Sequence, residues 1–269
     1  LLARQYYQMT SLLIKAKVDF NALCDQVLPG MQELMSDHAG RHKLSDFVLR
    51  YHHTAHILKM GETRFRKDYC KWAEKKGYRN CERMAALIFA TAQNGIPVLP
   101  NAPSTQIVIT EAIRVLHTVE ASRDAILTQM QALAKTLPEY SLVREMPCIG
   151  DTLAPRLIAE IGDVRRFHSK RALIAYAGID APPYQSGKFC ANNRHISKRG
   201  NRYLRKTGYE VMQSYVMHKP ANDPIFTFIE KKRSEGKSGK LAMVAGLNKF
   251  LRVYYGKVTE LYRSLPAIE

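Results

Sequence analysis

Ser186 is a hydroxyl-bearing residue at the entrance to a basic, acid-free segment. That segment reads Y-Q-S-G-K-F-C-A-N-N-R-H-I-S-K-R-G-N-R-Y-L-R-K from Tyr184 to Lys206, and no Asp or Glu lies between Asp180 and Glu210. A serine hydroxyl can attack a phosphodiester when its proton is removed and the charge on the phosphorus oxygens is stabilised. Arginine guanidinium groups are suited to stabilising this charge, because each can donate two hydrogen bonds to the phosphate oxygens. The residue types therefore favour chemistry on nucleic acid.

Two simpler interpretations stay open at this point. Q-S-G is also common turn chemistry, so Ser186 by residue type alone is more often a loop serine. The basic run can also act as a passive clamp that holds nucleic acid through its phosphates. The cations of the run are Lys188, Arg194, Lys198, Arg199, Arg202, Arg205 and Lys206.

Composition agrees with a polyanionic partner. The chain has 269 residues, a formal net charge of +17 and a pI near 9.7, yet 46% of its residues are hydrophobic, enough to build a core. Its five cysteines are widely spaced without a C-x-x-C pair, which indicates neither a disulfide framework nor a zinc site. No apolar run reaches the roughly 20 residues of a membrane helix, so no membrane partner is expected. The chain starts at Leu1 inside a helical pattern, and we expect that an N-terminal part has been removed.

The first 140 residues are predicted to form a long helical hairpin or coiled-coil stalk with a helical tip at about 40–95. One apolar seam with alternating spacings of four and three comprises Leu2, Tyr6, Met9, Leu13, Ala16, Phe20, Leu23 and Val27. A second comprises Ile109, Ile113, Leu116, Leu127, Met130, Ala134 and Leu137, and Glu120 and Arg123 interrupt it. The tip is rich in cations and aromatic residues. It is either a nucleic-acid surface with Trp72 free to stack or, as we favour, a small bundle with Trp72 in its core.

Residues 141–269 are predicted to form a second, helical domain. Met146 to Asp163 has the pattern of a helix-hairpin-helix, whose outward N–H groups near Gly150 can hold a phosphate without reading sequence. Ser169 and Gly178 are expected to bound the next helix. A loop at about 182–197, irregular or a β-hairpin, then carries Ser186. Ser197 is expected to cap a helix from about Arg199 to Lys219, and a last helix covers about 239–262. The predicted fold class is thus mainly α.

Metal binding has weak support in the sequence. His52 and His56 have the spacing of two ligands on one helix face, with His53 beside them, but no acidic or cysteine ligand is near. Asp151 and Asp163 stand where helix caps are expected, and capping is the favoured role. We therefore assign no metal ligand and no cofactor within this chain.

Four motifs in order resemble those of a known family: P-C-I-G-D-T-L-A-P-R-L-I-A-E-I-G-D, R-F-H-S-K-R-A-L-I-A-Y-A-G-I, Y-Q-S-G-K-F and R-H-I-S-K-R-G-N-R-Y-L-R. Their order resembles the C-terminal domain of the insertion-sequence one-ten (IS one-ten) family, the serine transposases described as bridge-RNA-guided recombinases. The resemblance is dense from Met146 to Lys206. It implies that Ser186 is the catalytic nucleophile and forms a transient phosphoserine link to DNA. It further implies DNA contacts at Lys198, Arg199, Asn201, Arg202 and Arg205. To these the basic run and the hairpin add Gly150, Lys188, Arg194 and Lys206.

The resemblance also implies partners that lie outside this sequence. Family members carry an N-terminal RuvC-like domain whose acidic residues bind Mg²⁺, and we recognise no copy of it here. A DNA donor and target, a structured guide RNA, a homo-oligomer (dimer or tetramer) and a prokaryotic, nucleoid-associated cytoplasmic location are expected of the full-length protein, and the fragment alone is expected to be inactive. The alternatives are a non-catalytic helix-hairpin-helix remnant that binds DNA, or a DNA-bridging protein held together by its helical seams.

Overall fold

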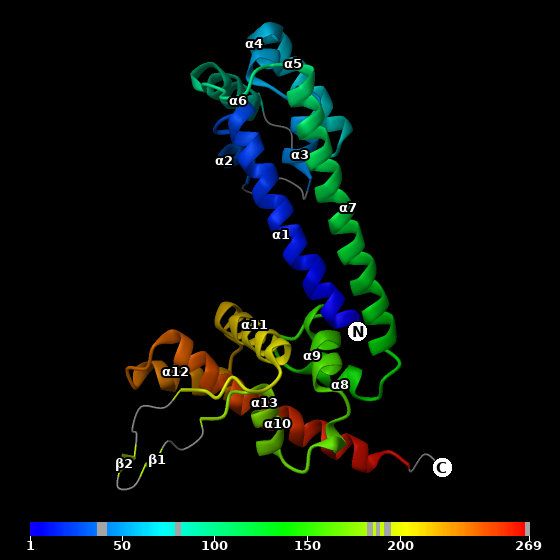
Figure 1. Cartoon of the computed structure of the whole chain (residues 1–269), viewed down its shortest axis with the longest axis vertical. Coiled ribbons are helices and arrows are strands. Elements are labelled where there is room, and N and C mark those ends of the chain that lie inside the picture. The colour runs from blue at the N-terminus through cyan, green and yellow to red at the C-terminus, as the bar shows by residue number, and fades with distance from the viewer. Residues whose placement is uncertain (37–41, 79–81, 182–184, 187–188, 191–194, 267–269) are drawn as a thin grey trace. The chain divides into compact units, whose positions relative to one another are not determined.

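The computed structural model describes residues 1–36, 42–78, 82–181, 185–186, 189–190 and 195–266, and this part of the chain is almost entirely helical (Figure 1). Its elements are α1 Leu2–Val27, α2 Met31–Ser36, α3 Lys43–Tyr51, α4 Thr54–Met60, α5 Glu62–Lys75, α6 Glu82–Asn94, α7 Pro103–Ala134, α8 Glu139–Glu145, α9 Leu153–Ile161, the 3₁₀ helix η1 Val164–Arg166, α10 Lys170–Ala177, β1 Gln185–Ser186, β2 Phe189–Cys190, α11 Arg202–His218, α12 Pro224–Ser234 and α13 Gly239–Ser264. The mainly α prediction is confirmed. None of these helices is both long and apolar enough to cross a bilayer.

The chain divides into two units, and the two longest early helices contribute to both. One unit comprises 1–6 and 125–269, and the other comprises 7–124. Within the second unit α1 and α7 run in opposite directions (Figure 1). Leu13 and Phe20 of α1 share a core there with Ile109 and Ile113 of α7. The predicted pairing of the two seams within one chain is therefore confirmed.

The seam positions are buried or half-buried with one exception. Leu137 is 41% exposed because α7 ends at Ala134, before that residue. Glu120, which interrupts the second seam, is only 5% exposed and lies 3.6 Å from His42 Nδ1 and 3.9 Å from Arg123. A charged residue at a seam position is thus accommodated by cationic or polar neighbours.

The second unit places Trp72 in an aromatic core. Trp72 is 7% exposed and its ring centroid lies 6.1 Å from Phe47, 6.2 Å from Tyr51 and 5.7 Å from Tyr69. The core interpretation of Trp72 is confirmed, and the stacking interpretation of this residue is wrong. A large aromatic side chain gains more from burial than from a partly solvated surface position.

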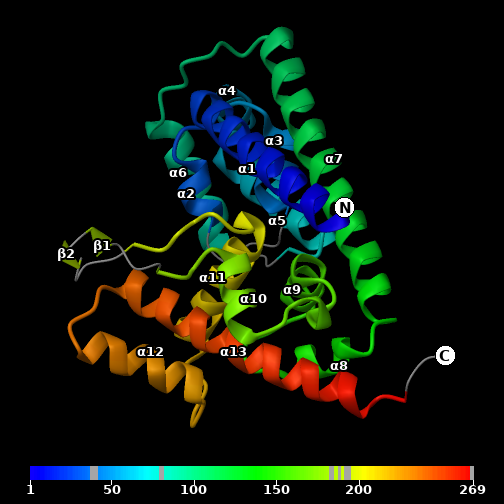
Figure 2. The same ribbon diagram turned by 60° about the horizontal axis from the view of Figure 1, so that its bottom comes forward.

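The first unit is built around α13. Helices α10, α11 and α12 all contact α13, and Figure 2 shows α12 running beside it. Leu247, Phe250, Leu251, Tyr254 and Val258 of α13 are buried in this core. The core therefore fixes α10 and α11, the two helices between which the chain carries Ser186.

Candidate nucleic-acid interface

Ser186 lies on a short antiparallel hairpin between α10 and α11. Strand β1 (Gln185–Ser186) pairs with β2 (Phe189–Cys190), with Ser186 opposite Phe189. Lys188 and Arg194 lie outside the described residues. The two ends of the serine-bearing segment are joined at Asp180 and Ser197, where the Ser197 N–H donates to the Asp180 carbonyl (2.8 Å) and its hydroxyl to the Asp180 carboxylate (2.5 Å). A double hydrogen bond therefore closes the base of the loop.

The helix that precedes this loop begins and ends as predicted. The Ser169 hydroxyl accepts from Ala172 N–H, and α10 ends at Gly178, whose φ of +66° is left-handed. Such a backbone conformation is inexpensive only for glycine, which makes it a common helix terminator. These local signals set the point from which the chain leaves toward Ser186.

The segment before α11 is pressed against the carboxyl end of α10. Lys198 N–H donates to the Gly178 carbonyl (3.0 Å), and Asn201 N–H to the Tyr176 carbonyl (2.5 Å). Between them, Gly200 has no room for a side chain, because a Cβ there would lie 2.6 Å from both the Ala175 carbonyl and the Gly178 nitrogen. Glycine at this position allows the two backbones to touch.

Asn201, not Ser197, caps α11. Its side-chain oxygen accepts from Tyr203 N–H (2.9 Å) and Leu204 N–H (3.1 Å), and its amide nitrogen donates to a Glu160 carboxylate oxygen (2.8 Å). The predicted Ser197 cap is wrong because α11 begins at Arg202, three residues later than expected. Both the oxygen and the nitrogen of the Asn201 side-chain amide thus have hydrogen-bond partners within the protein. The DNA contact predicted for Asn201 remains a prediction.

The basic residues around the start of α11 divide into one internal and several exposed cations. Arg205 is half-buried and donates to the Ala177 carbonyl (2.9 Å), so its guanidinium stabilises the carboxyl end of α10. In contrast, the side chains of Lys198, Arg199, Arg202 and Lys206 are exposed. Arg202 lies over the Tyr203 ring at 4.8 Å and donates to its hydroxyl.

Arg4 joins this exposed group from the far end of the chain. Its guanidinium lies 5.5 Å from the centroid of the same Tyr203 ring, in the same compact unit. The sequence did not point to Arg4, because Arg4 is remote from the basic run in the chain. The pattern around it predicts only a helix. Cations at the first turn of a helix oppose its dipole, so a phosphate at this surface would relieve an unfavourable field.

The predicted hairpin lies between α8 and α9. Gly150 is exposed, and its carbonyl accepts from both Leu153 and Ala154 N–H groups, which closes the turn. Asp151 does not cap α9 as predicted. It pairs instead with Arg144 (2.5 Å), and this hydrogen bond lowers the pKa of the Asp151 carboxyl. The ion pair carries no net charge, and the predicted phosphate contact at Gly150 stays a prediction.

Buried polar pairs beneath this surface were not foreseen. Glu160 is 5% exposed and receives the Asn201 amide, while Arg156, 4% exposed, lies 2.6 Å from a Glu210 carboxylate oxygen. Asp163 caps η1 through Arg165 N–H, as expected, and this Arg165 pairing lowers the pKa of its carboxyl. The signal for Glu160 was its place on the apolar face of α9, where a carboxylate requires a partner.

His53 of the second unit has structural partners on both ring nitrogens. His53 is 4% exposed, its Nδ1 accepts from Ala55 N–H, and its Nε2 lies 3.0 Å from the Leu99 carbonyl. The His52 and His56 rings are 4.8 Å apart. Across the described ranges, no group of three His, Cys, Asp or Glu side chains is placed to hold a metal ion.

The chain is similar to proteins of insertion elements and to a pilin gene-inverting protein. Residues 140–225 match the family profile described as "Transposase IS116/IS110/IS902 family". An insertion element IS110 protein of Streptomyces coelicolor, described as an uncharacterized 43.6 kDa protein, is 24% identical over 82% of this chain and 53% of its own length. A "pilin gene-inverting protein" of Moraxella bovis is 27% identical over 49% of this chain and 42% of its own length.

A shorter match has a higher percentage of identical residues. The transposase for insertion sequence element IS1111A of Coxiella burnetii is 33% identical over 29% of this chain and 21% of its own length. The chain thus spans about half the length, or less, of the curated relatives that it matches. The matched family profile covers the Ser186 hairpin and the start of α11.

Proposed function

We propose, from the match of residues 140–225 to the transposase profile of the IS116/IS110/IS902 family, that this chain is the strand-exchange part of a DNA transposase or recombinase in which Ser186 is the nucleophile. The observation that carries the proposal is the exposed basic surface formed by Lys198, Arg199, Arg202 and Lys206, directly after the loop that bears Ser186. DNA phosphates are the ligands that such a surface favours.

The proposed step is a transesterification at phosphorus. The Ser186 Oγ forms a bond to a DNA phosphorus, the bond from that phosphorus to a sugar oxygen breaks, and the proton lost by the serine balances the one gained by the leaving sugar hydroxyl. Attack by a hydroxyl of another DNA strand then releases Ser186 and joins the strands. Because phosphoester bonds are exchanged, the step needs no external energy source.

The surrounding cations are proposed to hold the DNA during this exchange. Asn201 caps α11 at its N-terminus, and the buried Glu160 in turn fixes Asn201. Arg202 and Lys206 project from the first turns of the same helix. Since positioning and charge stabilisation dominate phosphoryl-transfer catalysis, a rigid base for these cations suits the reaction.

Magnesium, a guide RNA and an oligomer belong to the wider proposal. The side chains of the described ranges do not fit a magnesium site, and no step is assigned to the ion in this chain. We infer that the metal site, the structured RNA and further copies of the chain complete the reaction in the full-length protein. Binding without catalysis is the second candidate, because the exposed cations alone suffice for salt-dependent DNA binding.

The decisive experiment compares Ser186→Ala with Ser141→Ala in the complete gene product, measuring donor–target joining in cells. Ser141 is an exposed serine of α8 and serves as the matched control. We expect joining to be lost in the first variant and kept in the second. Undiminished joining by Ser186→Ala would remove Ser186 from the mechanism. A covalent protein–DNA adduct that depends on Ser186 would exclude binding without catalysis.

A further inference from the structure

A basic cleft lies along α13, lined by other residues than the exposed cations at the start of α11. It has a volume of about 820 Å³, within the range of ligand sites. One stripe of α13 lines it, formed by Leu241, Ala245, Asn248 and Arg252 at spacings of four, three and four. Lys170 at the start of α10 and Ile179 after its end complete this part of the wall. No sequence motif pointed to this cleft, because its walls come from helices that are far apart in the chain.

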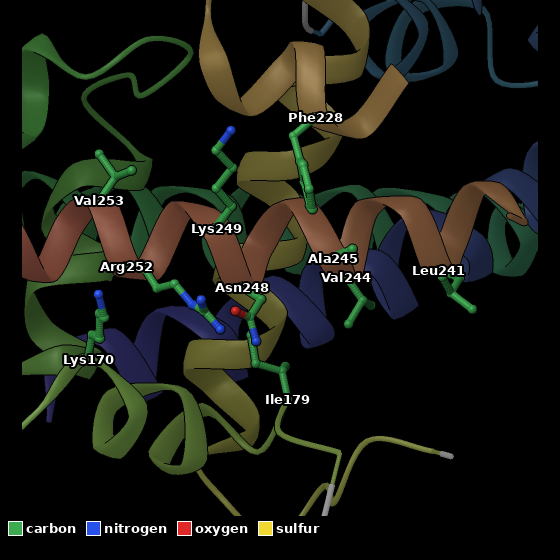
Figure 3. Close-up of a pocket in the computed structure, with 10 residues that line it drawn as sticks. All are labelled: Lys170, Ile179, Phe228, Leu241, Val244, Ala245, Asn248, Lys249, Arg252 and Val253. Carbon is green, nitrogen blue, oxygen red and sulfur yellow. The ribbon is translucent and has the colours of Figure 1, made fainter. Parts of the chain in front are cut away.

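The cleft is polar at one end and apolar at the other. Figure 3 shows Lys170 and Arg252 together at one end, Lys249 and Asn248 in the middle, and Val244, Ala245 and Leu241 toward the other. The Lys249 ammonium donates to the Pro224 carbonyl (2.7 Å). Leu241 is 48% exposed, so its side chain is accessible to a ligand in the cleft. A ligand that fits has an anionic part and a flat or apolar part side by side.

The polar end lacks compensating negative charge. Among the residues that the structure describes, neither Lys170 nor Arg252 has an ion-pair partner. The cleft is lined by no carboxylate, and the sequence has no Asp or Glu between Glu235 and Glu260. Lys170 also stands at the first turn of α10, where a cation opposes the helix dipole. An anion would therefore be stabilised there.

We propose that this cleft binds single-stranded nucleic acid, with backbone phosphate at Lys170 and Arg252 and an unstacked base at the apolar end. The Asn248 amide, which can both donate and accept, lies between the two and suits the edge of a base. A duplex does not fit this description because its bases are stacked on one another, so it offers base edges in its grooves but no free base face for the apolar end.

An acidic polypeptide is the competing occupant. It would satisfy Lys170 and Arg252 equally well, and a leucine side chain would fill the apolar end. Nucleic acid is favoured because the same unit already exposes cations at the start of α11 and because Asn248 adds a two-way hydrogen-bonding group beside the cations. The proposal rests on the nucleic-acid part of the proposed function and is independent of Ser186.

The test uses the full chain and two matched double variants. Lys170→Gln/Arg252→Gln removes two charges inside the cleft, and Lys240→Gln/Lys257→Gln removes two exposed charges of the same helix outside it. Binding of a fluorescein-labelled single-stranded DNA is measured by anisotropy across a salt series. We expect about a tenfold loss for the cleft variant and under about threefold for its control. The salt slope of the cleft variant should fall by about 1.4, the value for two phosphate contacts on a single strand.

Further probes identify the occupant. The unaltered chain should bind the base-bearing strand more tightly than an abasic strand of equal length, and Ala245→Phe, which fills the apolar end without changing charge, should narrow that difference. Equal losses in the two double variants would overturn the proposal. So would a cleft variant that loses poly-glutamate binding but keeps binding to the DNA strand, since that result identifies an acidic polypeptide. A failure of the nucleophile assignment is seen separately, as donor–target joining retained by Ser186→Ala in the complete gene product.

Discussion

Replacing Gly200 with alanine should loosen the junction that positions α11. The new Cβ would lie 2.6 Å from the Ala175 carbonyl oxygen and the Gly178 nitrogen, and closer still to the Tyr176 carbonyl oxygen. All three are backbone atoms, which cannot rotate away as a flexible side chain would. The segment before α11 must therefore move away from α10.

The expected cost follows from two contributions. Overpacking of a tight site costs typically about 1 to 3 kcal/mol. The movement also lengthens the hydrogen bond from Asn201 N–H to the Tyr176 carbonyl, worth about 1 kcal/mol. We expect the Gly200→Ala variant to lose about 2 to 4 kcal/mol of unfolding free energy in the unit that contains α10 and α11.

Chemical denaturation combined with hydrogen exchange measures this loss. Because the chain has two compact units, peptide-level exchange is needed to assign the loss to α10 and α11. Gly256→Ala is the control, since a Cβ there meets nothing within 4 Å and alanine is favoured inside the helix α13. That control should be unchanged or slightly more stable.

A Gly200→Ala protein as stable as the unaltered chain would refute the reasoning. It would mean that the backbone contact between Gly200 and the end of α10 is not close in solution. Faster exchange confined to the second unit would refute it equally, because the contact lies wholly in the first. DNA binding offers a further readout, since displacement of Asn201 also displaces Arg202 and should weaken binding.

Three other outcomes are expected. Asn201→Ala removes the α11 cap and the donor to buried Glu160, and should cost about 2 kcal/mol in chemical denaturation; a cost below about 0.5 kcal/mol would contradict the cap. The fluorescence of Trp72, the sole tryptophan, should stay unquenched when DNA is added, because its ring is packed in a core. Burial and the neighbouring His42 lower the pKa of His117, so its stabilising contribution is complete above the ordinary histidine pKa and declines as pH falls below it. Melting temperatures at about pH 7.5 and 5.5 should therefore differ less in His117→Asn than in the unaltered chain.

Local signals in the sequence were sufficient for several elements. Ser169 caps the start of α10, and Gly178 ends that helix. The spacing of the apolar seams of α1 and α7 predicted which faces of these two helices are buried. These features depend on residues close together in the chain, where capping groups and helical periodicity act directly. The ordered motifs around Ser186 likewise identified the segment that carries the family resemblance.

Other features depended on contacts between distant segments. Ser197 and Asn201 are both good capping residues, and only the contact of Gly200 with α10 determines that the helix starts after Asn201. Arg205 and Arg202 look alike in the basic run, yet one binds the Ala177 carbonyl and the other is exposed.

The sequence by itself determined that Ser186 is followed by a dense group of cations and that its surroundings are helical. Tertiary structure decided which of those cations are exposed, that Arg4 joins them, and that Lys170 and Arg252 share a cleft. The physical reason is that charge and hydroxyl chemistry belong to residue types, whereas solvent exposure and hydrogen-bond partners arise only when helices far apart in the chain are packed together.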